Sequence, residues 1–342
     1  MNTPRKVFVL LLALAAGPAT ASGVDDLRGA DAALKKGQFK EAVVHANKAI
    51  ASGQLKKSTL AIAYMRRAQA YAALGDAKNA IESCTKVIEL DPTTPLGYSL
   101  RGSLYIQLKE FEKAIEDYTR VIALDPRKAN GWTNRAIAKV TKGDLGTSLQ
   151  DLRRAIEVEP NNPVAYYYRA NLYFYQGNYA AAAADYRKHS ELVPGDAYTI
   201  IKLYQTAARV DENARTEFLR LAAGVTTRDW PYPIIELYLG KRTPQSLIEQ
   251  VRGAASRPEL ERACETYFYV GYQYLLNEDQ QSAKMLFERA VATGVSDFNE
   301  YFTYSSTPLP SSRGMFSSRI SGVLPSPRLI TRVVAETGRR SR

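Results

Sequence analysis

Evenly spaced prolines interrupt an otherwise helical chain and limit what it can fold into. Pro92, Pro126, Pro160 and Pro194 follow one another at intervals of 34 residues. The stretch AIEDYTRVIALDP, which ends at the second of them, reads as helix up to its proline. A proline inside a helix costs about 3 kcal/mol, because it removes a hydrogen bond and clashes with the preceding turn. The spacing therefore predicts helices that end before each proline and a structural unit that repeats every 34 residues.

Units that begin at residues 61, 95, 129 and 163 carry side chains of similar size at fixed positions. Position 4 is aromatic, position 11 is tyrosine in three of the units, and positions 8 and 20 are small. In that order the residues are Tyr64, Tyr98, Trp132 and Tyr166; Tyr71, Tyr105, Lys139 and Tyr173; Ala68, Gly102, Ala136 and Ala170; and Ala80, Ala114, Ser148 and Ala182. Small residues let two helices approach closely. The pattern predicts an all-α fold in which helical hairpins stack into a right-handed α-solenoid.

This pattern resembles the tetratricopeptide repeat family, with departures at Lys139 and Ser148. An earlier copy fits residues 23–56, with Gly37 in its turn, and a later copy starts near Cys264. The resemblance implies a fold of repeated helix pairs that binds other proteins and carries no catalytic site.

The remaining segments complete the predicted organisation. Five repeat units are expected over residues 22–196, a non-repeat helical segment that caps the solenoid over 197–262, and a C-terminal hairpin over 263–304. The run Trp230-Pro231-Tyr232-Pro233 is expected to be extended, because residues before proline avoid the helical region.

The first 21 residues differ from the rest of the chain. Arg5 and Lys6 precede an apolar run of ten residues, and small residues follow it. This order is typical of a secretory signal peptide, with cleavage expected between Ala21 and Ser22. A retained N-terminal anchor is the alternative. No cysteine follows the apolar run, so we expect no lipid anchor.

The positive charge is concentrated at the two ends. Of the net charge of +11, +6 lies in residues 305–342 and +2 in the first 21 residues, which leaves +3 for everything between. Nucleic-acid binding by the folded part is therefore not expected. Residues 305–342 are rich in Ser, Pro and Arg, and we predict a disordered tail. The tail either contacts an anionic membrane surface through its arginines or is inert.

Arginine recurs at position 7 and aspartate at position 23. The spacing of 16 residues predicts three ion pairs across the hairpins, and we favour this structural interpretation over an arginine ladder that binds carboxylates. The pairs are Arg101–Asp117, Arg135–Asp151 and Arg169–Asp185. Arg67 lacks such an acid, because Ser83 takes that position.

A curved stack has a concave surface, and we expect the first helix of each repeat to line it with positions 2, 5, 9 and 12. The groove residues that we single out are Met65, Gln69, Ser99, Ser103, Thr133, Ile137, Tyr167, Asn171 and Phe174. The last of these make the later part aromatic, as binding hot spots often are. The alternative is that Tyr167 and Phe174 pack against the following helices around Trp230.

Patterns of catalysis are missing from the sequence. There is no phosphate loop and no G-x-S-x-G motif, and neither His45 nor His189 has metal-ligand spacing to other ligands. We predict no enzyme activity, no cofactor and no metal. Cys84 and Cys264 are expected to be free, because distant repeats of a solenoid do not touch.

The later third adds a closer resemblance. The segments RDWPYPIIELYLGKRTPQSL, CETYFYVGYQYL and AVATGVSDFNEY are similar to the C-terminal half of NlpI-type bacterial envelope proteins. This resemblance implies a periplasmic scaffold or adaptor, with proteases or cell-wall hydrolases among the partners, and relatives of this type can be homodimers. The alternative is an envelope-assembly or cell-division factor that contacts peptidoglycan or membrane-associated partners, with its basic tail as a surface contact.

Overall fold

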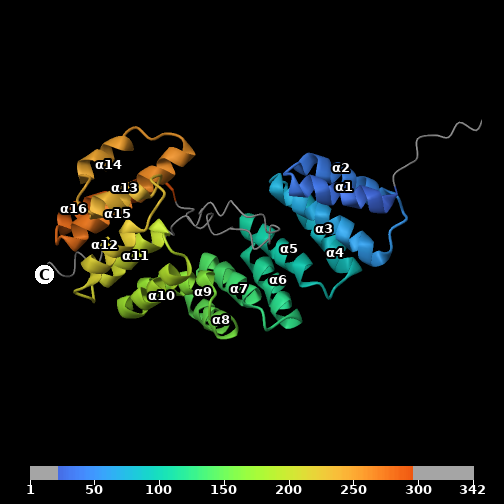
Figure 1. The fold of residues 1–342 in the computed structure, drawn as a ribbon, viewed down its shortest axis with the longest axis horizontal. Coiled ribbons are helices and arrows are strands. Elements are labelled where there is room, and N and C mark those ends of the chain that lie inside the picture. Colours follow the sequence, from blue (N-terminus) through green and yellow to red (C-terminus); the bar gives the residue numbers. More distant parts are fainter. Residues whose placement is uncertain (1–21, 296–342) are drawn as a thin grey trace, which may run out of the picture. The chain divides into compact units, whose positions relative to one another are not determined.

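The computed structural model describes residues 22–295, and the regular structure in this range is entirely helical. It holds sixteen helices and no strand, as the repeat pattern predicted. The chain divides into two compact units, residues 1–92 and 93–342 (Figure 1). The predicted leader, residues 1–21, the predicted tail, residues 305–342, and residues 296–304 of the predicted last hairpin lie outside the described residues.

The first unit consists of two helical hairpins. Its helices are α1 (Gly23–Lys35), α2 (Phe39–Ala51), α3 (Lys57–Ala73) and α4 (Ala77–Leu90). Each helix packs on the next. Ser22 begins the unit as an N-cap, because its side chain accepts a hydrogen bond from the Asp25 amide at 3.2 Å.

The second unit begins with three further hairpins. Their helices are α5 (Pro95–Gln107), α6 (Phe111–Leu124), α7 (Ala129–Lys142), α8 (Leu145–Val158), α9 (Pro163–Tyr175) and α10 (Tyr179–Leu192). The second helix of each 34-residue repeat, α4 in the first unit and α6, α8 and α10 here, ends two residues before a proline of the series. The prolines therefore act as helix stops, as the spacing predicted.

Small residues hold the two helices of each hairpin close together. The residues at positions 8 and 20 are buried in all four repeats. At Gly102 an added Cβ would lie 3.1 Å from the ring of Tyr118 on the opposite helix, so a larger side chain would push the helices apart. Ser148, which departs from the family pattern, satisfies its buried hydroxyl by donating to the Leu145 carbonyl at 2.9 Å.

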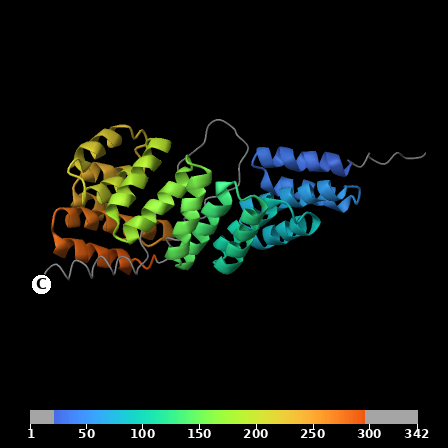
Figure 2. The same ribbon diagram turned by 90° about the horizontal axis from the view of Figure 1, so that it is seen from below.

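Six further helices complete the second unit and share one large hydrophobic core. They are α11 (Ala197–Ala207), α12 (Ala214–Ala223), α13 (Tyr232–Tyr238), α14 (Pro244–Gln250), α15 (Arg257–Leu276) and α16 (Gln280–Ala292). The long hairpin α15–α16 lies beside α13 and α14, and α13 in turn packs on α11 (Figures 1 and 2).

The expectation of an extended Trp230–Pro233 run is wrong, because Trp230 and Pro231 already lie in a turn, with Pro231 at φ −97° and ψ 22°. Tyr232 and Pro233 form the first turn of α13, and the Trp230–Pro231 peptide bond is cis. A proline in the first turn is tolerated, because its missing N–H would have no intrahelical partner there.

The three arginine–aspartate pairs are present, and each has two hydrogen bonds. Arg135 donates from Nε to Asp151 Oδ2 at 2.9 Å and from Nη2 to Oδ1 at 2.7 Å. The same two contacts measure 2.7–2.9 Å in Arg101–Asp117 and Arg169–Asp185. Each arginine also lies over the aromatic ring at position 4 of its own helix. The arginines therefore tie the two helices of a hairpin together.

Two residues that break the repeat pattern still take part in this arrangement. Arg67 is not without a partner, because its Nε donates to Ser83 Oγ at 3.0 Å. Lys139, where the other repeats have tyrosine, donates to Asp151 Oδ2 at 2.8 Å. Asp151 therefore lies between two cations. The prediction of free cysteines is confirmed for Cys84 and Cys264, which are both buried.

We predict that Asp151 is worth more to stability than either of its cations. Asp151→Ala leaves Arg135 and Lys139 facing each other in a largely buried place, and should lower the free energy of unfolding by about 3–5 kcal/mol. Arg135→Ala should cost less, because Lys139 still neutralises the carboxylate. Arg154→Ala, at an exposed pair with Glu157, is the control and should cost about 0–1 kcal/mol.

Chemical unfolding of the single variants and of the double variant Arg135→Ala/Asp151→Ala measures these losses. The double variant should lose less than the sum of the two single variants. Strictly additive losses would count against coupling between the two side chains.

Candidate functional site

The predicted groove residues of the first unit lie at different depths. Met65 is buried, whereas Gln69 is partly exposed and its Oε1 accepts a hydrogen bond from Arg66 Nη1 at 3.4 Å. In the second unit Ser99 and Ser103 are partly exposed. Thr133 and Ile137, one repeat later, are buried. Only some of the predicted positions are therefore accessible to a partner.

The last predicted groove residues belong mainly to the interior. Asn171 donates from Nδ2 to the Tyr167 carbonyl at 2.8 Å, and its Oδ1 accepts from Tyr186 Oη at 2.9 Å and from Lys202 Nζ at 2.6 Å. Both Tyr167 and Asn171 are buried. This agrees with packing on following helices, here α10 and α11, rather than with an open aromatic wall. Phe174 alone of the three is partly exposed.

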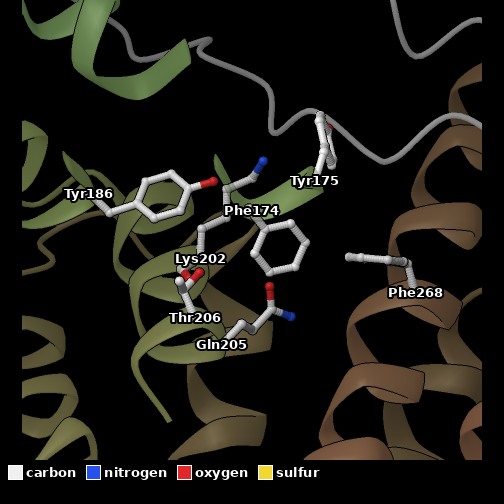
Figure 3. Close-up of a pocket in the computed structure, with 7 residues that line it drawn as sticks. All are labelled: Phe174, Tyr175, Tyr186, Lys202, Gln205, Thr206 and Phe268. Atoms are coloured by element: carbon white, nitrogen blue, oxygen red, sulfur yellow. The ribbon is translucent and has the colours of Figure 1, made fainter. Parts of the chain in front are cut away.

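A pocket in the second unit lies where α9 and α11 face α15. Phe174, Tyr175, Tyr186, Lys202, Gln205, Thr206 and Phe268 line it. Its cavity volume is about 10 Å³, which is room for about one water molecule, and the rest of the hollow is open to solvent. Figure 3 shows Phe268 approaching from α15 on one side, with Phe174 and Lys202 on the other. The pocket thus combines aromatic walls with one buried cation.

Lys202 is the cation, and the fold keeps it away from water. Its ammonium group donates to Asn171 and lies 5.3 Å from the centre of the Tyr167 ring. Burial lowers the pKa of Lys202 to about 7, against the opposing effect of the nearby carboxylates of Asp196 and Glu265. The side chain therefore changes charge close to neutral pH.

Glu265 of α15 is the matching buried acid. Tyr198 Oη donates to its Oε2 at 3.1 Å, and Trp230 Nε1 donates to the same carboxylate. Burial raises the pKa of Glu265 to about 7, because these hydrogen bonds and the charge of Lys202 offset only part of the desolvation. Glu265 thereby connects its own helix, α15, to α11 and to the loop that precedes α13.

Three buried polar atoms near this network have no hydrogen-bond partner among residues 22–295. They are His189 Nε2, Thr266 Oγ1 and Tyr269 Oη. Burial also lowers the pKa of His189, whose Nδ1 lies 2.8 Å from Thr199 Oγ1. Polar atoms of this kind are commonly satisfied by internal water.

Neither metal ligation nor membrane crossing finds support in the described part of the chain. No group of three or more His, Cys, Asp and Glu side chains there is placed to hold a metal ion. Within the same residues no helix has both the length and the apolar character that crossing a bilayer requires.

Comparison with known proteins supports the repeat assignment directly. The family description "Tetratricopeptide repeat" matches residues 61–94 and, in a second model, residues 100–169. These two stretches therefore match tetratricopeptide repeats.

Solved structures of other proteins align with the chain over about half of its length or more. PilF of Pseudomonas aeruginosa shares the fold: it is 15% identical, and the match covers 64% of this chain and 97% of that protein with a TM-score of 0.54. A crystal structure of MamA is 23% identical over 48% of this chain and 93% of its own, with a TM-score of 0.44. A tetratricopeptide repeat protein of Thermus thermophilus is 19% identical over 54% and 98%, with a TM-score of 0.43.

Three of the four repeats expose an apolar side chain at position 2, a predicted groove position at which no residue was singled out. Leu96 and Val164 in the second unit are 56% and 39% exposed, and Asn130 between them is exposed as well. In the first unit the equivalent residue is Ile62, which is also exposed. Position 2 is therefore the most accessible part of the predicted binding surface.

Sequence reasoning missed Lys202 and Glu265. The available signal was a single charged residue on an otherwise apolar stretch, IIKLY in one case and ACETYFY in the other. Charged residues are almost never fully buried unless they are paired. Such a residue on a core-facing helix indicates a partner, although it does not say where the partner lies.

We predict that Glu265 makes stability depend on pH. The pKa of Glu265 in the folded protein is about 7, above its ordinary value of 4.5. Between pH 4.5 and pH 7 the folded protein therefore keeps a proton on Glu265 that the unfolded chain has released. Stability should therefore fall as pH rises from about 4.5 to about 7. Lys202, with its pKa lowered from 10.5 to about 7, acts in the opposite direction above pH 7.

Glu265→Gln keeps an acceptor for Trp230 and removes the titration. This variant should show a smaller fall between pH 5 and pH 7, and the difference should reach at most about 3 kcal/mol at pH 7. Urea unfolding at several pH values measures it, with Glu288→Gln on the exposed face of α16 as the control. Equal slopes in the wild type and in Glu265→Gln would contradict the prediction.

Proposed function

We propose that this chain is a non-enzymatic adaptor that binds partner polypeptides on the first helices of its tetratricopeptide repeats. Such repeats bind other proteins. The observation that carries the proposal is the exposure of Leu96 and Val164 at the start of α5 and α9. Burial in the hairpins accounts for the apolar residues at positions 8 and 20, but not for these two.

The surface around them suits a polypeptide of mixed character. Between the two apolar residues lies the exposed amide side chain of Asn130, and Ser99 and Ser103 add hydroxyl groups on α5. Alternating apolar and hydrogen-bonding groups are what an extended or helical segment of a partner requires. We call the surface formed by Leu96, Asn130 and Val164 the ridge. We place partner binding on this ridge rather than on the buried residues Tyr167 and Asn171.

We further propose that the adaptor works in the bacterial periplasm without a lipid anchor. The N-terminal leader pattern and the NlpI-type resemblance of the last third support this location. Cleavage between Ala21 and Ser22 would leave Ser22 in place as the N-cap of α1. Proteases and cell-wall hydrolases are the partners that the resemblance favours.

The binding surface can be tested with a charged double variant. Leu96→Asp/Val164→Asp should reduce recovery of partner proteins from bacterial envelope extracts at least about tenfold, because two desolvated apolar contacts are each worth more than about 1 kcal/mol. Leu219→Asp on α12, at a side chain that is 47% exposed, is the matched control. Thermal unfolding should be unchanged in both variants.

Two outcomes would redirect the proposal. Equal loss of partners in the Leu219→Asp control would show that added charge, not the ridge, is responsible. Recovery of outer-membrane assembly factors instead of proteases or hydrolases would favour the envelope-assembly alternative.

The location can be tested independently of the partner. We expect the mature protein in the periplasmic fraction, with Ser22 as its first residue by N-terminal sequencing. Replacing Ala19 and Ala21 by bulky residues should block cleavage. A cytoplasmic protein that keeps its N-terminal residues would contradict this part of the proposal.

A further inference from the structure

We propose that Asn130 is a site of spontaneous deamidation, and that the carboxylate formed there weakens partner binding on the ridge. The second part rests on the proposed function, whereas the chemistry at Asn130 does not. Asn130 and Gly131 form the one Asn-Gly pair in the sequence. Deamidation begins when the backbone nitrogen of the next residue attacks the asparagine side chain, so the structure around Gly131 decides whether it can proceed.

Packing between α6 and α7 requires a glycine at position 131. An added Cβ would lie 2.9 Å from Cγ1 of Ile122 and 3.1 Å from Cγ1 of Val121, both on α6. A larger residue would therefore strain this contact. Glycine also brings no side chain that could shield its own backbone nitrogen from Asn130. The reactive Asn-Gly pair is thus a consequence of close helix packing.

The backbone N–H of Gly131 lies in the first turn of α7, where a helix provides no acceptor for it. The next repeat satisfies the equivalent N–H of Ala165, which donates to Oδ1 of the N-cap residue Asn162 at 3.0 Å. The N-cap of α7 is Lys128, whose side chain makes no such bond. Within residues 22–295 the Gly131 N–H has no hydrogen-bond acceptor, so this nitrogen is not held in place.

The side chain of Asn130 is exposed on the same turn. In the interior of a helix, hydrogen bonds on both sides of a peptide group prevent the rotation that the attack requires. In the first turn the N–H side of the peptide group lacks such a bond. Helix ends also open locally at little cost in free energy. The Gly131 nitrogen can therefore reach the Asn130 side chain without unfolding of the hairpin.

The reaction consumes one water molecule and releases one ammonia molecule. The Gly131 nitrogen forms a bond to Cγ of Asn130, and the bond from Cγ to the side-chain nitrogen breaks. The proton of the Gly131 N–H leaves with that nitrogen as ammonia. Water then opens the cyclic imide at either of its two carbonyl carbons. One product has aspartate at position 130, and the other has isoaspartate, in which the main chain runs through Cγ.

Either product places a negative charge in the middle of the ridge. Leu96 and Val164 occupy the same repeat position one unit before and one unit after Asn130. The dipole of α7 stabilises a carboxylate in its first turn, so the fold tolerates the aspartate product. An apolar partner segment must instead desolvate this charge in order to bind there. Deamidation would therefore release partners while the repeats stay folded.

Peptide mapping by mass spectrometry of the purified full-length protein, kept at neutral pH, measures the conversion. We expect the folded protein to deamidate at Asn130 at least about tenfold faster than at Asn161 or Asn213, which are exposed but are not followed by glycine. An isoaspartate methyltransferase should label the same peptide. Equal rates at the three sites, or a reaction that occurs only after unfolding in urea, would overturn the proposal.

A restored cap tests the role of the Gly131 N–H. Lys128→Asn should supply an acceptor where α9 has Asn162 and slow the reaction about fivefold, which corresponds to a cap worth about 1 kcal/mol. Lys128→Ala removes the same exposed charge without adding an acceptor and is the matched control. Equal rates in the two variants would contradict control by the unbonded N–H.

The effect on partners is tested with variants of fixed charge in the envelope-extract assay. Asn130→Asp should recover at least about fivefold less partner than Asn130→Gln, because one desolvated contact is worth more than about 1 kcal/mol. If deamidation is fast but the two variants recover partners equally, the regulation is wrong and the modification site stands. If Leu96→Asp/Val164→Asp also keeps its partners, the proposed binding surface has failed instead.

Discussion

Close contact between the two helices of each hairpin is the constraint on which the rest of the structure depends. At Gly102 the opposing Tyr118 ring leaves no room for a larger side chain, and Gly271 meets Phe287 in the same way on the last hairpin, with an added Cβ 3.1 Å from the ring. This proximity fixes the distance between the helices. It also brings position 7 of one helix opposite position 23 of the other, which allows the two-point contact between arginine and aspartate.

These features could be predicted from the sequence because they repeat. A repeated contact leaves the same residue type at the same position in several units, so Arg135 and Asp151 are supported by the pairs before and after them. The helix ends were equally predictable, since each proline excludes helix for a local reason. Lys139 was harder to interpret, because a single departure from a pattern does not show which neighbour replaces the missing contact. The structure supplies that neighbour as Asp151.

The last third of the chain was less predictable for the same reason. Its helices do not repeat, so contacts such as Tyr198 with Glu265 join residues that no periodicity relates. The burial of Lys202 depends on α9, α11 and α15 together, and none of these three segments indicates the other two. The aromatic character of Tyr167 and Phe174 was visible in the sequence, but whether such rings face a partner or the interior depends on the helices that follow.

Those helices also determine where a binding surface on the second unit can lie. The repeats from α5 to α9 keep position 2 accessible. Position 9 of the last repeat is Asn171, and its amide oxygen accepts hydrogen bonds from Tyr186 of α10 and Lys202 of α11. The first-helix surface therefore passes from an open ridge at Leu96 into a narrow pocket at Phe174. A buried cation and aromatic rings line this pocket, and its enclosed space fits about one water molecule.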